Sequence, residues 1–136
     1  MSYEGTETDQ FADQLQVIDN IISNNLDCHI VVGGDFNVDL SRARVHTAML
    51  NSFCSNLDLN LAMSHDKCQI DYSYSFNSIR YDVLDHFLLS GTLYSTSVDR
   101  VTVLHDIDNL SDHKPIVLDL SLNIHCVGFQ GRIYTP

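Results

Sequence analysis

The chain has 136 residues, the length of one domain, and 44% of them are hydrophobic and 18% charged. This composition is typical of a globular protein and argues against disorder, and no apolar run approaches the roughly 20 residues that cross a bilayer. The net charge of −11, from 18 acidic and 7 basic residues, disfavours a surface that holds nucleic acid through clustered Lys and Arg, although carboxylates also bind hard cations.

The first third of the chain predicts a helix, a strand and a second helix. Apolar residues recur at helical spacing over residues 9–25, with Thr8 as a plausible N-cap. The apolar run 29–32 is typical of a short buried strand that ends at Gly33-Gly34. Residues 45–57 place their apolar side chains on one face of a second helix.

The remaining elements are predicted as strands, at residues 59–63, 71–76, 84–89, 97–104 and 115–122. The last of them alternates, with Ile116, Leu118, Leu120 and Leu122 on one face. Two helices with six strands predict an α/β (α+β) sandwich. The apolar residues of 124–136 follow neither a helical nor a strand periodicity, and we expect an irregular tail there.

Targeting and cysteine usage point to a soluble intracellular protein, nuclear or cytoplasmic, without membrane contact. The first residues contain no basic stretch followed by an apolar stretch, so no signal peptide is visible. The four cysteines lie far apart without a CxxC pair, which indicates free thiols instead of a zinc site or a disulfide framework.

The first chemically suggestive motif is Gly34-Asp35-Phe36-Asn37, directly after the predicted buried strand. A carboxylate and a carboxamide two residues apart in such a loop can both face one cleft. A plain turn is the alternative, because Gly, Asp and Asn form turns through local hydrogen bonds.

The second motif, residues 110–115, places Asp112 beside His113 just before the last strand. This pair offers a hard oxygen ligand next to a side chain that can be charged near neutral pH. A capped turn that leads into an edge strand with Pro115 at its start is the alternative.

The third motif is Asp85 at the head of the apolar run 84–89. A carboxylate inside an apolar strand needs a positive partner, since burial of an unpaired charge is costly. His113 is the candidate partner, and a solvated strand face is the alternative. His86, Asp82 and Tyr81 are expected to flank the site.

In this order and spacing, the three motifs and the segment Tyr72-Ser73-Tyr74 resemble the second half of the endonuclease/exonuclease/phosphatase superfamily. The resemblance covers about residues 1–122 and is greatest to the apurinic-endonuclease-like endonuclease domains of non-LTR retrotransposons. It implies half of a four-layer α/β sandwich of the deoxyribonuclease I type, with a mixed, mostly antiparallel sheet.

The resemblance also implies roles for individual residues. Asp35 would orient or deprotonate the attacking water, and Asn37 would hold the scissile phosphate. Asp112 would bind Mg²⁺ (or Mn²⁺), while Asp85 would keep His113 protonated so that its imidazolium stabilises charge on the phosphate. Ser73 would support the site from its strand.

One departure from the family's pattern affects the expected activity. The first half of the family's domain supplies a metal-binding Glu, a substrate-binding Asn and a Tyr, and these are not matched here. Residues 1–5 resemble the segment just after that Tyr, so we expect residues 1–123 to be the C-terminal part of the domain. The tail would then lead toward a reverse transcriptase domain in the parent protein.

Three functions remain open from the sequence. The leading hypothesis is a metal-dependent DNA endonuclease of a retrotransposon, impaired by truncation. A phosphatase that acts on a small phosphorylated substrate would need the same motifs. An inactive remnant or a protein-binding half-domain is the third.

Overall fold

The computed structural model describes residues 3–106 and 108–122, with side chains from residue 6 onward. The predicted tail at 124–136 lies outside these residues. The elements, in chain order, are α1 (Tyr3–Ser23), β1 (Val31–Asp35), α2 (Val45–Asn56), β2 (Leu59–Leu61), the 3-10 turn η1 (Ala62–Ser64), β3 (Cys68–Gln69), β4 (Tyr74–Phe76), β5 (Arg80–Asp82), β6 (Asp85–Ser90), α3 (Gly91–Thr96), β7 (Val98–Val103) and β8 (Ile116–Leu120).

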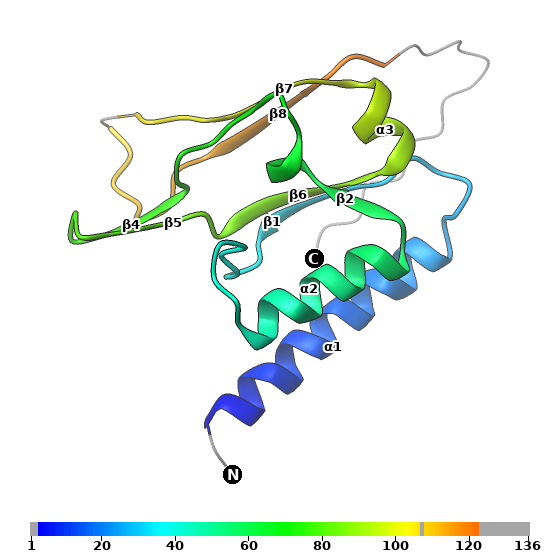
Figure 1. The fold of residues 1–136 in the computed structure, drawn as a ribbon, viewed down its shortest axis with the longest axis horizontal. Coiled ribbons are helices and arrows are strands. Elements are labelled where there is room, and N and C mark those ends of the chain that lie inside the picture. Colours follow the sequence, from blue (N-terminus) through cyan, green and yellow to red (C-terminus); the bar gives the residue numbers. More distant parts are fainter. Residues whose placement is uncertain (1–2, 107, 123–136) are drawn as a thin grey trace.

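The strands form two small sheets and a separate hairpin. The first sheet has the order β1-β6-β2 and is fully antiparallel. The second has the order β3-β7-β8, in which only the β3–β7 pair is parallel, and β4 pairs with β5 in the hairpin. Helices α1 and α2 lie along one side of the first sheet, and β7 and β8 lie on its other side (Figure 1). The predicted α+β class with mixed, mostly antiparallel pairing is confirmed.

Strand β6 separates two hydrophobic cores. Successive side chains of a strand point to opposite faces, and both Leu88 and Leu89 are fully buried. Leu88 packs with Leu50 of α2 and Phe11 of α1, whereas Leu89 packs with Val101 of the second sheet. The apolar run in the third motif therefore reflects a strand that is covered on both faces.

Several boundaries differ from those predicted. The strand expected at residues 71–76 is Tyr74–Phe76, so Ser73 lies just before it. Helix α1 begins at Tyr3, six residues before residue 9, so Thr8 lies inside the helix and does not cap it. The Thr8 hydroxyl is 3.5 Å from His46 Nε2. Strand β1 continues through Gly33 and Gly34, since its pairing with β6 runs on to Asp35. Gly33 lies under the Phe87 ring, which leaves no space for a larger side chain.

Four elements were not predicted, namely η1, β3, β5 and α3, so the described part of the chain has three α-helices where two were expected. Strands β3 and β5 have two and three residues, too few to show a period. The hairpin that creates β5 turns at Asn77 and Ser78, whose φ angles of 51° and 53° are those of a tight hairpin turn.

Two further expectations from the sequence concern the cysteines and membrane-spanning helices. Cys54 and Cys68 are free thiols, as predicted. Within the described residues, none of the helices combines the length and the apolarity that a membrane span requires.

The contact between Gly33 and Phe87 can be tested by substitution. A Cβ atom at Gly33 would lie 2.7 Å from a ring carbon of Phe87, whereas one at Gly34 would meet nothing within 4 Å. We expect Gly33→Ala to lower the free energy of unfolding by about 1–3 kcal/mol and the melting temperature by several degrees. Gly34→Ala is the matched control and should leave the melting temperature unchanged or slightly raised. Equal melting temperatures of the two variants would contradict the packing described.

Candidate functional site

Strands β1 and β6 place two carboxylates opposite each other. Asp35 ends β1, Asp85 begins β6, and the two are directly paired in the antiparallel register. Directly opposite residues on such strands share one face, where like charges repel. The side chain of Asp85 is only 15% exposed and that of Asp35 is 49% exposed. This pair requires a positive group close by.

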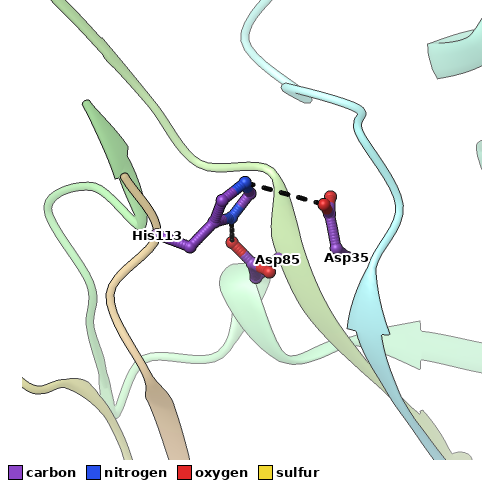
Figure 2. Close-up of side chains that lie close together, drawn as sticks. All are labelled: Asp35, Asp85 and His113. Atoms are coloured by element: carbon purple, nitrogen blue, oxygen red, sulfur yellow. Dashed lines mark hydrogen bonds and ion pairs between the residues drawn. The ribbon is translucent and has the colours of Figure 1, made fainter. Parts of the chain in front are cut away.

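His113 supplies that group from the segment before β8 (Figure 2). Its Nδ1 lies 2.9 Å from Asp85 Oδ2, and its Nε2 lies 3.7 Å from Asp35 Oδ2. The contact predicted between Asp85 and His113 is thereby confirmed. The hydrogen bond with Asp85 raises the pKa of His113 against the opposing effect of burial, and the charges of Asp85, Asp35 and Asp112 raise it further. The imidazolium form is thus favoured more than in a histidine without these partners.

Ser73 fixes the positions of Asp85 and His113 through backbone hydrogen bonds. It is fully buried, and its Oγ accepts hydrogen bonds from the backbone N–H groups of Leu84 at 3.0 Å and Asp85 at 3.2 Å. Its own carbonyl accepts a hydrogen bond from the backbone N–H of Lys114 at 2.7 Å. Ser73 therefore joins the start of β6 to the segment that carries His113.

The loop after β1 is both a turn and part of the site. Asp35 Oδ1 accepts a hydrogen bond from the backbone N–H of Asn37 at 2.8 Å, which leaves Oδ2 facing His113. Asn37 has a φ angle of 52°, a conformation that Asn tolerates better than most residues, and it is exposed. The turn therefore holds the Asp35 carboxylate in place and presents the Asn37 carboxamide to solvent.

Asp112 lies beside this group but does not join it. It is exposed, and its backbone carbonyl accepts a hydrogen bond from Ser75 N–H at 3.0 Å. Over the described ranges, the one group of candidate metal ligands is Asp35, Asp85 and His113, whose ligand atoms lie within 4.8 Å of one another. Hard divalent cations take carboxylate oxygens, so Asp35 and Asp85 can hold a metal ion, whereas a protonated His113 offers it no lone pair.

His86, which the sequence placed only at the flank, has a structural function. It is 1% exposed, and its Nε2 donates a hydrogen bond to the Val38 carbonyl at 2.6 Å, next to Asn37. Burial lowers the pKa of His86, so the imidazole is neutral. No sequence signal separates this histidine from a solvated one, because its acceptor is a backbone group 48 residues away.

Asp39 and Asp82 connect neighbouring segments near the site through hydrogen bonds and ion pairs. Asp39 accepts hydrogen bonds from the backbone N–H groups of Ser41 at 2.8 Å and Val83 at 3.1 Å. Asp82 is buried and forms ion pairs with Arg42 at 2.6 Å and Arg80 at 2.5 Å. The sequence predicted only a flanking position for Asp82 and did not indicate these pairs, of which the one with Arg42 joins segments 40 residues apart.

A family model and several solved structures match the chain. The model of the Endonuclease/Exonuclease/phosphatase family matches residues 2–113. The endonuclease domain of TRAS1, a telomere-specific non-LTR retrotransposon, is similar with a TM-score of 0.66 at 18% sequence identity, over 83% of this chain and 52% of that one. No curated protein sequence matches.

Two structures from Bacteroides thetaiotaomicron are also similar. An endonuclease/exonuclease/phosphatase family protein gives a TM-score of 0.59 at 21% identity, over 83% of this chain and 45% of that one. A mannosyl-6-phosphatase gives 0.54 at 23% identity, over 82% of this chain and 44% of that one. The chain thus spans about half the length of these proteins, and the similarity shows a shared fold.

The contact between Asp85 and His113 predicts how the pKa of His113 changes when Asp85 is replaced. Replacing Asp85 by Asn removes the negative partner, so the pKa of His113 should fall toward the ordinary value of about 6.5. The measurement is an NMR titration of the imidazole signals. Asp71→Asn is the matched control, because Asp71 pairs with a different histidine, His105, at 2.7 Å. An unchanged pKa of His113 in Asp85→Asn would show that the two side chains do not interact in solution.

Burial of His86 predicts acid sensitivity. Because the folded-state pKa lies below the unfolded value of about 6.5, the unfolded chain binds the extra proton first. The free energy of unfolding should therefore fall as the pH drops below about 6.5. His86→Gln keeps a donor near Val38 but does not titrate, so its urea-unfolding free energy should depend less on pH between 6.5 and 5. An identical pH dependence in both proteins would refute a buried neutral His86.

Proposed function

This chain belongs to the Endonuclease/Exonuclease/phosphatase family, and we propose that its site hydrolyses phosphodiester bonds in DNA with a divalent cation, as the endonuclease of a retrotransposon. The supporting observation is the convergence of three separate motifs. Asp35, Asp85 and His113 come from β1, from β6 and from the segment before β8, and they meet within 4.8 Å.

Asp35 is the proposed group for the attacking water. Its side chain is half exposed, and its Oδ2 lies 3.7 Å from His113 Nε2, which leaves the carboxylate able to accept a hydrogen bond from water. Its Oδ1 is held by the Asn37 backbone, so the carboxylate keeps a fixed direction. The exposed Asn37 carboxamide is proposed to hold the scissile phosphate beside it.

His113 is proposed to stabilise negative charge on the phosphate. Charge that develops on the phosphate oxygens in the transition state is stabilised best by positive groups that are already in place. Asp85 orients the imidazole through Nδ1 and keeps it protonated, which leaves Nε2 on the side of Asp35. Ser73 acts as a support, because it fixes the backbone of Asp85.

The cation is proposed to be Mg²⁺ or Mn²⁺, with Asp112 as a ligand next to the Asp35–Asp85 pair. Such an ion supplies positive charge to the phosphate oxygens and lowers the pKa of a bound water. Hard divalent ions of this kind are usually held by few carboxylates together with several waters, which suits a half-exposed cluster.

The similar structures support two substrate classes. The fold shared with the TRAS1 endonuclease domain supports DNA. The fold shared with a mannosyl-6-phosphatase supports a small phosphorylated molecule, which is the second candidate. Because the solved structures are about twice as long as the matched part, we propose that residues 1–123 belong to a longer domain.

Plasmid nicking tests the proposal. In Mg²⁺, the 136-residue chain should show little or no nicking, because weak metal binding and a phosphate misplaced by about 1 Å cost on the order of 10²-fold in rate. Extension of the chain by the family's first half should restore nicking. In the extended protein, Asp35→Ala should lower the nicking rate by about 10²-fold or more.

Asp99→Ala is the matched control, since Asp99 is an exposed carboxylate on β7, away from the motifs. Nicking that survives Asp35→Ala would remove Asp35 from the mechanism. Release of phosphate from a sugar phosphate, without nicking, would favour the second candidate. If the short chain nicks and His113→Ala abolishes nicking, the first half is dispensable.

A further inference from the structure

A cavity of about 470 Å³ lies next to the proposed catalytic loop. Asn37 lines this cavity, and its backbone N–H donates a hydrogen bond to Asp35 Oδ1, so the cavity borders the loop that carries Asp35. Arg42, Arg44 and Arg80 line it as well. The whole chain has only seven Lys and Arg residues against 18 acidic ones. Three arginines at one cavity are therefore a marked local concentration of guanidinium groups.

Two of these arginines are held in place by one buried carboxylate. The side chain of Asp82 is fully buried, and its two oxygens contact Arg42 Nη2 at 2.6 Å and Arg80 Nε at 2.5 Å. One negative charge thus holds two positive ones, and the trio keeps a net charge of about +1. Each guanidinium has five N–H donors and is partly exposed, at 39% for Arg42 and 51% for Arg80. Both retain donors for a ligand.

The third arginine adds charge at the start of α2. Arg44 is the N-cap residue of that 12-residue helix, without a side-chain hydrogen bond to the helix, and the first turn has no acidic residue. A helix N-terminus favours an anion through its N–H groups and dipole, and here it adds to the charge of the arginines. The first turn also carries His46, which lines the cavity and contacts Phe11 and Thr8.

Two carboxylates line the same cavity, Asp39 and Glu7, and the charge of Asp39 interacts with that of Arg42. With Asp82 they balance the formal charge of the three arginines, so the cavity offers an anion guanidinium donors and no excess of positive charge. Asp39 is already bound to the backbone N–H groups of Ser41 and Val83. Glu7 is an exposed side chain of α1 on the cavity's border. A tetrahedral anion with several acceptor oxygens matches the arginine donors, because guanidinium binds phosphate with paired hydrogen bonds.

We propose that this cavity binds a second phosphate group of the substrate, next to the scissile phosphate held at Asn37. This inference rests on the proposed function and deepens it. In DNA the group is a neighbouring backbone phosphate, and in a small substrate it is a further phosphate of the same molecule. The arginines act in binding and in positioning the substrate along the loop.

The test is the salt dependence of binding to a fluorescently labelled DNA duplex, measured by anisotropy in EDTA so that no metal contributes. Arg44→Gln leaves the Asp82 ion pairs intact and should lower the slope of log affinity against log salt by about 1, the loss of one phosphate contact. Arg42→Gln, which leaves Arg80 with Asp82, should weaken binding several-fold. Arg100→Gln is the matched control, an exposed arginine paired with Asp119 on the second sheet.

Equal slopes in the wild type and Arg44→Gln, or an equal loss in Arg100→Gln, would overturn the proposal. If the duplex does not bind, inorganic phosphate and a sugar bisphosphate are titrated while the NMR signals of the arginine side chains are followed. Shifts confined to Arg42, Arg44 and Arg80 support the cavity and identify a small substrate, whereas no shift overturns it. Nicking that depends on Asp35 but is insensitive to the three arginines would retain the proposed function and reject only the phosphate cavity.

Discussion

The repulsion between Asp35 and Asp85 is the constraint on which the rest of the site depends. The two carboxylates are direct partners in the β1–β6 register, and His113 lies between them as the compensating charge. A slip of one residue would turn one carboxylate to the other face of the sheet. Gly33 under Phe87 and the contacts of Ser73 with the start of β6 both oppose such a slip. Local packing therefore sets the geometry of the charged group.

Strand β6 connects this charged end to the stability of the fold. Its middle is buried on both faces, against the helices through Leu88 and against the second sheet through Leu89. Its first residue, Asp85, emerges at the end where β1 and the segment before β8 meet (Figure 2). A rigid strand that ends in a half-exposed cluster gives the fixed placement that catalysis on a phosphate needs.

The sequence predicted the features that depend on local patterns. These are the second helix, most of the strands, and the need of Asp85 for a positive partner, which proved to be His113. Features that depend on distant backbone groups were missed, such as His86 bound to Val38 and Asp82 bound to Arg42. The exposed position of Asp112 outside the cluster was also not foreseen, because adjacent residues in an irregular segment can point in different directions.

Paramagnetic line broadening by Mn²⁺ tests most directly whether a divalent cation binds where β1, β6 and the segment before β8 meet. Small amounts of Mn²⁺ are added to the labelled chain, and the amide signals are followed by NMR. The account predicts that signals of Asp35, Asp85 and His113 broaden first, and that Asp85→Asn weakens this effect. Broadening that centres instead on the acidic residues of α1, such as Asp9 and Asp13, would show that the cation follows surface charge and would contradict the site.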